Sequence, residues 1–430
     1  MNDARSIASA RIAQAFKQFP DLESTLFECD ALDPRDSALA RAIDRSIRKR
    51  WLTLVSVIEH ASNRPFGTLE PPVAASLLVG CTQLLLFDRI PDHAIIDCAV
   101  DWTRHGGKRP RATGFVNAVL RKIVRLRKSV EETGEVGNNC HLPRGDGSWV
   151  CFHEPVFKSE APQFGFSKKS WQRVVQQLGG EMSVKFGLHA IAEPPLIVAG
   201  TQLPESVTPH SIPMFGIAPP ELQISDLLSA NPKVRIQDPT SGSSLSLLHT
   251  IDQQPTRILD LCAGRGTKTK QLRELFPNAM IGATEPNEGR RAVLEELAVD
   301  LDVAVYTPEG ASPTEPFDVV VADVPCSNSG VFARRPEAKY RYDTKHVDSL
   351  VALQQSIIRD AMGVIKSGGH LLYATCSIDR EENGSQVGWM QRKRGLTLLD
   401  QKATLPSGLP GADPTCWNDG GFTALLAKSG

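Results

Sequence analysis

The sequence predicts an α/β protein in which a doubly wound domain follows an all-helical domain and a small α+β domain. Two patterns in the 430 residues carry this prediction. Over residues 1–130 apolar side chains recur at helical spacing, whereas after Arg235 short apolar runs alternate with helices, as in a parallel sheet covered on both faces. We expect domains at 1–130, 166–235 and 236–430, with a linker or insert at 131–165.

The first domain is predicted to be helical because its apolar residues fall on stripes. Residues 37–58 show this spacing and contain no proline, and Pro71 opens a second helix. A third helix is expected at 113–128, where Phe115 and Val119 lie on one stripe. The segment 131–165 shows no such period and is rich in Gly, Asn and Pro, which is typical of a loop.

The basic residues of the first domain are concentrated in residues 108–128. Residues 1–130 hold 20 Lys and Arg against 14 Asp and Glu, a net charge of +6, while the rest of the chain has 28 against 35, a net of −7. A charge run is usually a solvated helix face, but this run contains no acid, which favours an anionic partner such as RNA. The candidate RNA-binding residues are Lys108, Arg109, Arg111, Arg121, Lys122 and Arg125.

Composition places the chain among ordinary globular proteins. Apolar residues make up 41% and charged residues 23%, which excludes a disordered or collagen-like chain. The start has no apolar signal core, and the longest apolar run, 75–87, is too short for a membrane span, so we expect a cytoplasmic protein without a membrane partner. The nine cysteines show no Cys-x-x-Cys spacing, and we expect free thiols and no metal, although a Cys/His cluster occurs at Cys140, His141, Cys151 and His153.

The second half reads as strands alternating with helices. Ligands of such sheets gather at the carboxyl ends of the strands, so the residues that follow each strand are the candidates for chemistry. Strands are expected at 257–261, 280–284, 303–306, 317–322 and 370–375, with helices at 267–275, 288–298 and 349–365.

A glycine turn follows the first of these strands. Residues 260–269 read Asp-Leu-Cys-Ala-Gly-Arg-Gly-Thr-Lys-Thr, and glycines in such a turn let the backbone approach a ligand at a helix N-terminus. Glu285 ends the second strand, about 20 residues later, where a carboxylate typically holds ribose hydroxyls. The pair favours a nucleotide-like ligand. A phosphate loop is excluded because its Gly-x-x-x-x-Gly-Lys spacing is absent.

Two cysteines follow two other strands of the same sheet. Cys326 comes three residues after Asp323, and Cys376 directly follows the strand at 370–375. A buried structural thiol is the common reading of either one alone. Two cysteines at the ligand-binding edge, one of them close to an acid, are explained better by a nucleophilic role than by a structural one. A thiolate is strongly nucleophilic where its surroundings favour the charged form.

These motifs resemble a known family. The segments 323–330 (Asp-Val-Pro-Cys-Ser-Asn-Ser-Gly) and 373–383 (Tyr-Ala-Thr-Cys-Ser-Ile-Asp-Arg-Glu-Glu-Asn) resemble the paired signature of RNA 5-methylcytosine methyltransferases of the Nol/Nop/Sun type. The segment 114–121 (Gly-Phe-Val-Asn-Ala-Val-Leu-Arg) is similar to the NusB-like RNA-binding module that precedes the catalytic domain in bacterial members. Gln237-Asp238 and the closing residues 419–422 extend the resemblance.

The resemblance implies a Rossmann-like class I methyltransferase domain that uses S-adenosylmethionine. The reaction implied is transfer of a methyl group to C5 of a cytosine in RNA, most often 16S ribosomal RNA, through a covalent bond from Cys376 to C6. In that scheme Cys326 assists product release, Asp323 hydrogen-bonds the cytosine, and Lys268 favours the thiolate. The cofactor would lie against Cys262, Ala263, Gly264, Arg265, Gly266, Thr267, Lys268, Glu285 and Asp323.

Alternatives stay open at this point. A transfer-RNA methyltransferase, a NusB-like RNA-binding protein with a weakened catalytic domain, or another Rossmann enzyme such as a nicotinamide dehydrogenase would share part of the pattern, although the last does not explain the cysteine pair. The chain also departs from the family pattern: Thr267 replaces a glycine, Glu285 replaces an aspartate, and Glu309 is only a candidate for the acid after the third strand. A His-Pro-Asp segment appears as Arg335-Pro-Glu337. A monomer is expected.

Overall fold

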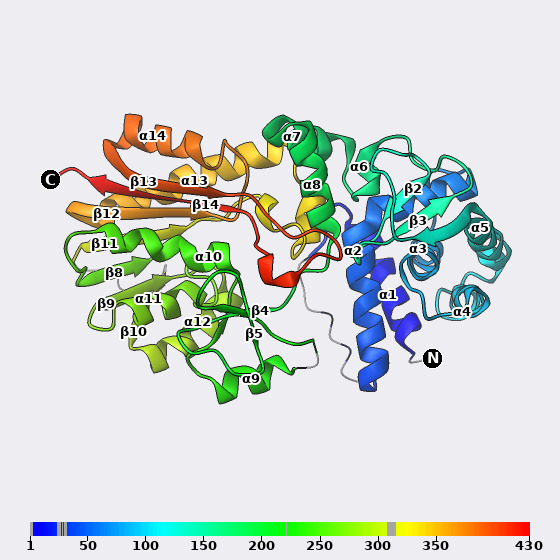
Figure 1. Ribbon diagram of the computed structural model, residues 1–430, viewed down its shortest axis with the longest axis horizontal. Helices are drawn as coiled ribbons and strands as arrows, with labels where there is room; N and C mark the ends of the chain where they lie inside the picture. The colour runs from blue at the N-terminus through cyan, green and yellow to red at the C-terminus, as the bar shows by residue number, and fades with distance from the viewer. Residues whose placement is uncertain (1–2, 24–26, 28, 30–31, 221, 308–314) are drawn as a thin grey trace. The chain divides into compact units, whose positions relative to one another are not determined.

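A computed structural model describes the chain except residues 1–2, 24–26, 28, 30–31, 221 and 308–314 (Figure 1). The chain divides into two compact units. The first comprises Met1–Glu193, Phe332–Tyr342 and Leu409–Ala412, and the second comprises Pro194–Val331, Asp343–Gly408 and Asp413–Gly430. Chain segments therefore pass from one unit to the other more than once, which a division at single boundaries does not capture.

The apolar faces of the first five helices form one core in the first unit, which confirms the predicted helical domain. The long second helix begins at the N-cap Asp33, whose side chain accepts hydrogen bonds from the backbone amides of Arg35 and Asp36. The third helix is buried over nearly its whole length. The helices are α1 (Ala4–Gln18), α2 (Pro34–Ser62), α3 (Pro71–Leu86), α4 (Asp92–Arg104) and α5 (Thr113–Leu126).

The segment 131–165 is folded and is not a linker. A three-stranded antiparallel sheet in the order β1-β3-β2 is formed by β1 (Arg127–Glu131), β2 (His141–Pro143) and β3 (Trp149–Phe152), and α6 (Glu160–Gln163) follows. Leu142 and Val150 join the core of the helical domain. The strands are three to five residues long and separated by turn residues, so no sequence period could reveal them.

The predicted middle domain at 166–235 is divided between the two units. The helices α7 (Lys168–Leu178) and α8 (Gly180–Ile191) belong to the first unit, where Phe166 packs against Phe332 at a ring distance of 5.6 Å. Residues 194–235 belong to the second unit. There a sheet in the order β5-β6-β4-β7 is formed by β4 (Ile197–Ala199), β5 (Thr208–Pro209), β6 (Phe215–Ile217) and β7 (Arg235–Ile236), beside α9 (Ile224–Ala230).

A break in α2 is closed by residues from far along the chain. Arg50 has non-helical backbone angles (φ −122°, ψ 18°) inside this helix. The hydroxyl of Tyr340 accepts a hydrogen bond from the amide of Trp51 and donates one to the carbonyl of Arg48, and the ammonium of Lys339 donates to the carbonyl of Lys49. These backbone groups are thereby satisfied within the first unit by the short helix η5 (Pro336–Tyr340).

The second unit contains a seven-stranded sheet in the order β10-β9-β8-β11-β12-β14-β13 (Figure 1). The first five strands pair in parallel, and β14 runs antiparallel between β12 and β13. The strands are β8 (Arg257–Asp260), β9 (Met280–Thr284), β10 (Val303–Tyr306), β11 (Phe317–Asp323), β12 (Ile365–Thr375), β13 (Leu396–Thr404) and β14 (Gly421–Lys428).

Two separate apolar cores cover the two faces of this sheet, which confirms the doubly wound fold. On one face, Val320 of β11 packs with Ile358 of α13 (Thr344–Val364) and Met390 of α14 (Gly384–Arg394). On the other, Val321 packs with Leu272 of α11 (Thr267–Leu275). The remaining helices include α10 (Pro239–Ser243) and α12 (Glu288–Leu301). The strand order reverses between β8 and β11, which places a ligand site at the carboxyl ends of these strands.

The described helices include none that is both long and apolar enough to cross a bilayer.

Candidate functional site

The ends of β11 and β12 bring two thiols together. These strands pair in parallel with Asp323 opposite Ala374, so the residues that follow them meet at one edge of the sheet. The sulfur atoms of Cys326 and Cys376 lie 3.0 Å apart. Cys326 is buried, whereas Cys376 is partly exposed. Two cysteines 50 positions apart in the sequence therefore form one site.

A buried glutamate connects the two loops that carry these thiols. Glu382 is 0% exposed. Its carboxylate accepts hydrogen bonds from the backbone amide and hydroxyl of Ser327 (2.9 and 2.5 Å), and from the hydroxyl of Ser377 (2.6 Å). Gln354 donates a fourth at 2.9 Å. Because Ser327 follows one cysteine and Ser377 the other, Glu382 fixes the two loops relative to each other.

An amide also bridges the pair. The thiol of Cys376 donates a hydrogen bond to the side-chain oxygen of Asn328 at 3.2 Å, and the Asn328 side chain donates to the carbonyl of Cys326. Asn328 has φ +57°, a left-handed conformation that Asn tolerates better than most residues. The hydrogen bond that the Cys326 thiol donates to Cys376, then burial and the charges of Cys376 and Glu382, raise the pKa of Cys326 well above its ordinary value, so Cys326 is a thiol at neutral pH.

Lys268 and Asp323 form an ion pair beside Cys376. The ammonium of Lys268 donates to the carboxylate of Asp323 at 2.7 Å and to the hydroxyl of Ser241 at 3.0 Å. Burial opposes the charge of Lys268, but the attraction and hydrogen bond of Asp323 outweigh it and raise the pKa of Lys268. Lys268 therefore presents a fixed positive charge at the thiol site at neutral pH.

The glycine turn forms a second part of the site. Gly264 and Gly266 have φ of +62° and +86°, and a side chain at Gly264 would meet no protein atom within 4 Å. Thr267 and Arg265 are not among the residues with positive φ, so the replaced glycine costs no backbone strain. Glu285 is buried and accepts hydrogen bonds from the amides of Gly264 (3.0 Å) and Asn287 (2.8 Å).

Asp260 is a candidate site residue that the sequence argument did not single out. It is 0% exposed at the end of β8, and one carboxylate oxygen accepts a hydrogen bond from the hydroxyl of Thr269 at 2.7 Å. Its other oxygen is buried and has no partner within the described part of the chain. Burial raises the pKa of Asp260 to about 6. The sequence signal that could have identified Asp260 is its position as the last residue of β8.

Cys262, which was expected along the cofactor site, is a different kind of thiol from the central pair. Burial, followed by the charges of Asp260, Asp323 and Glu285, raises its pKa to about 12. A thiol that stays protonated in this way is not a nucleophile at neutral pH.

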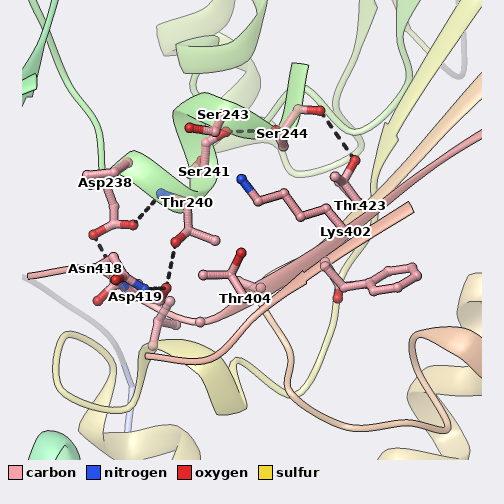
Figure 2. Close-up of a pocket in the computed structure, with 18 of the residues that line it drawn as sticks. Asp238, Thr240, Ser241, Ser243, Ser244, Lys402, Thr404, Asn418, Asp419 and Thr423 are labelled. Atoms are coloured by element: carbon pink, nitrogen blue, oxygen red, sulfur yellow. Dashed lines mark hydrogen bonds between the residues drawn. The ribbon is translucent and has the colours of Figure 1, made fainter. Parts of the chain in front are cut away.

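A cavity of about 180 Å³ opens beside Cys376 and is also lined by Lys268 and Asp323. Figure 2 shows its wall: α10 on one side, and Lys402 of β13 reaching into the cavity on the other. Asp238, which was noted in the resemblance, accepts hydrogen bonds from the amides of Thr240 (2.8 Å) and Asp419 (3.1 Å) and so joins α10 to the closing segment. Lys402 escaped sequence reasoning because it lies on a late strand that no motif marks.

The candidate RNA-binding residues lie in the first unit. Lys108, Arg109 and Arg111 line a cavity of about 530 Å³ together with Phe115 and Arg64, whose guanidinium lies over the Phe115 ring. The run itself contains no acid, but two of its arginines pair with acids elsewhere in the first unit: Arg109 pairs with Glu70 at the start of α3, and Arg127 pairs with Asp92 of α4 at 2.7 Å. The residues on α5 are Arg121 and Arg125, which are exposed, and Lys122, which is partly buried.

Other residues noted in the sequence lie elsewhere. In the first unit, Glu337 belongs to η5 and Arg335 directly precedes it, and Glu309 lies outside the described residues. All nine cysteines are free thiols. Within the described ranges, no group of three His, Cys, Asp or Glu side chains could hold a metal ion.

Comparisons with known proteins agree with this arrangement. Residues 247–410 match the family model described as 16S rRNA methyltransferase RsmB/F, and residues 3–125 match the NusB family. The ribosomal RNA small subunit methyltransferase B of Erwinia tasmaniensis is 27% identical, over 100% of this chain and 99% of the relative. The protein of that name from Xanthomonas campestris is 29% identical, over 90% of this chain and 88% of the relative.

Solved structures share the fold. The crystal structure of PH0851 matches with a TM-score of 0.70 and 20% identity, over 99% of both chains. The structure of NSun6 from Pyrococcus horikoshii with SFG matches with a TM-score of 0.50 and 18% identity, over 62% of this chain and 99% of that one.

Proposed function

Because the chain belongs to the 16S rRNA methyltransferase RsmB/F family and carries a NusB-family domain in front, we propose that it methylates C5 of a cytosine in 16S ribosomal RNA. The family resemblance of the two cysteine motifs is thereby confirmed, and the protein is an S-adenosylmethionine-dependent RNA methyltransferase. The observation that supports the cytosine chemistry best is the pair of thiols 3.0 Å apart, because methylation at C5 needs a nucleophile and a means of releasing it.

Covalent catalysis makes C5 reactive. C5 of cytosine is a poor nucleophile, but a thiolate of Cys376 that bonds to C6 pushes an electron pair onto C5, which then takes the methyl group. The bound S-adenosylmethionine supplies that methyl group as an electrophile. Transfer of the C5 proton to a base afterwards restores the double bond and expels the thiolate, and Cys326 assists this release.

The geometry supports Cys376, and not Cys326, as the nucleophile. Cys376 lines the cavity with Lys268 and Asp323, whereas Cys326 is buried behind it and has a raised pKa. Asp323 offers the cavity a carboxylate that can accept a hydrogen bond from the cytosine amino group. Lys268 places a positive charge at the wall of the same cavity. The base must leave its stack to enter a cavity of this kind.

The residues around the glycine turn fit S-adenosylmethionine. A side chain at Gly264 would meet no protein atom, so this face of the turn is open to a ligand. Asp260 has a buried oxygen without a partner in the described chain, and a positively charged group is favoured next to it. We assign cofactor binding to the turn residues Cys262 to Lys268, with Glu285 on the ribose and Asp323 at the methyl-donor end.

The helical domain is proposed to hold RNA phosphates. Lys108, Arg111 and Arg121 are exposed, so their charges are available to an anionic backbone. Such contacts position the RNA without reading its sequence. A cytoplasmic location and a monomeric state belong to the same proposal.

Bisulfite sequencing of RNA from a deletion strain tests this function. We expect one 16S cytosine to lose its 5-methyl group, to regain it with the wild-type gene, and to stay unmethylated with Cys376→Ala. Loss of methylation in transfer RNA instead would overturn the substrate, and no change in any RNA would overturn the activity.

A further inference from the structure

A second cavity lies within the first unit and shares no residue with the methyl-transfer site. Its volume is about 230 Å³. The side chains of α2 form one wall, and the turn between β2 and β3 forms another. The charged residues that line it are Lys49, Arg50, Arg144, Asp146 and Glu193.

Three buried cations meet at this cavity. Lys49, Arg50 and Arg144 are 2%, 3% and 4% exposed. Two of them have carboxylate partners: Lys49 pairs with Glu193 at 2.9 Å, and Arg144 pairs with both oxygens of Asp88 at 2.7 and 2.8 Å. Cations are rarely buried to this degree unless an anion compensates them, so the third one requires an explanation.

Arg50 is the cation without a carboxylate. Its guanidinium donates one hydrogen bond, to the carbonyl of Pro143 at 2.7 Å. Two of its nitrogen atoms, Nε and Nη1, are buried and have no partner among the residues that the structure describes. Lys49 and Lys339 lie close to it, and burial lowers the pKa of all three side chains, that of Arg50 to about 9. The protein therefore maintains a poorly compensated positive charge here.

The break in α2 does not explain why the guanidinium of Arg50 is buried. The backbone groups at the break are already satisfied by Tyr340 and Lys339. The single bond to Pro143 uses one of the five N–H groups of the guanidinium. Lys49 likewise retains a donor, since its ammonium has three and spends two, on Glu193 and on the carbonyl of Ala192.

We propose that this cavity binds a phosphate-class oxyanion, held by Arg50 and Lys49. A tetrahedral oxyanion accepts several hydrogen bonds at once, and a planar guanidinium can donate two of them in parallel. The hydroxyl of Ser46, which also lines the cavity, is a further donor. The same chemistry is offered by free phosphate and by a phosphate of an RNA backbone. This site is independent of the proposed methyl transfer.

Titration of the full-length protein with inorganic phosphate at constant ionic strength, followed by calorimetry, tests the site. We expect saturable binding that Arg50→Met weakens about tenfold or more, as loss of a charge-assisted contact does. Arg104→Met, which removes an exposed cation of the same unit, is the matched control and should bind phosphate as the wild type does. If Arg50→Met fails to fold, Lys49→Met serves in its place.

A second arm identifies the source of the anion. If Arg50→Met also weakens binding of a short RNA, and phosphate competes with that RNA in the wild type, the site takes an RNA phosphate. If phosphate binding is lost but RNA affinity is unchanged, the site takes a free anion. The site is refuted if phosphate does not bind, or if it binds the wild type and Arg50→Met equally.

Discussion

Replacing Glu382 by glutamine should keep its shape and remove its charge, and so loosen the two loops that carry the thiols. The carboxylate accepts four hydrogen bonds in a site with no exposure, three of them from Ser327 and Ser377. A glutamine side chain has one oxygen and one NH₂ group. The groups that donate hydrogen bonds to one of the two carboxylate oxygens would therefore face the NH₂ group, which is itself a donor. Hydrogen bonds to a charged group contribute about 1.5–3 kcal/mol each, and the loss of one or two should cost about 2–4 kcal/mol of unfolding free energy.

The effect on catalysis should be larger than the effect on cofactor binding. Misplacement of reacting groups by about 1 Å can cost on the order of 100-fold in rate, and we expect a decrease of about that size in kcat. The KM for S-adenosylmethionine should change little, because Glu382 contacts the cysteine loops and not the glycine turn. Removing the negative charge lowers the pKa of Cys326, which by itself does not compensate for lost geometry.

Methyl transfer from radiolabelled S-adenosylmethionine to a 16S RNA fragment measures kcat, and urea denaturation measures stability. Ser327→Ala and Ser377→Ala each remove one donor and should show smaller decreases. Glu288→Gln, an exposed carboxylate on α12, is the control and should match the wild type. The reasoning is refuted if Glu382→Gln keeps kcat within about twofold and loses no stability.

Two other predictions concern charge. The pKa of Asp260 is raised to about 6, so the fold favours its protonated form; this stabilisation is complete below about pH 4 and is lost as pH rises through 6. The gain in unfolding free energy of Asp260→Asn over the wild type should therefore be about 3 kcal/mol larger at pH 7.5 than at pH 4. Urea denaturation at both pH values measures this gain, and an equal gain at both would contradict the prediction. Arg111→Gln should weaken RNA binding and reduce the slope of log affinity against log salt concentration by about one. Arg109→Gln should have a smaller effect, because Arg109 already pairs with Glu70. Equal losses of affinity in filter binding at several salt concentrations would argue against the assignment.

The methyltransferase core was predictable because its signals are local. Each strand is a short apolar run. Asp323 ends β11, Cys376 directly follows β12, and Gly264 and Cys326 lie in the turns after β8 and β11, so parallel pairing alone brings them to one edge. The role of Glu382 could not be read from the sequence, since its partners lie 55 and 5 positions away and only the fold shows which of its neighbours it contacts.

The domain boundaries failed for a different reason. A division of a sequence assumes that each unit is continuous, but the first unit includes Phe332–Tyr342, which lies between β11 and α13 of the second. Phe332 and Lys339 are both buried. Neither lies in a periodic sequence pattern that would assign it to the helical domain. Similarly, the strands at 127–152 are too short for alternation to appear, and their burial depends on helices far away in the sequence.

The roles of the two cysteines are tested most directly by the covalent adduct. Incubation of each variant with S-adenosylmethionine and the target RNA, followed by denaturing electrophoresis, separates free protein from protein bonded to RNA. Cys326→Ala should accumulate the adduct, because the Cys376 thiolate still attacks C6 but its release is impaired. Cys376→Ala should form none. Adduct formation by Cys376→Ala, with none from Cys326→Ala, would reverse the two roles and contradict the account.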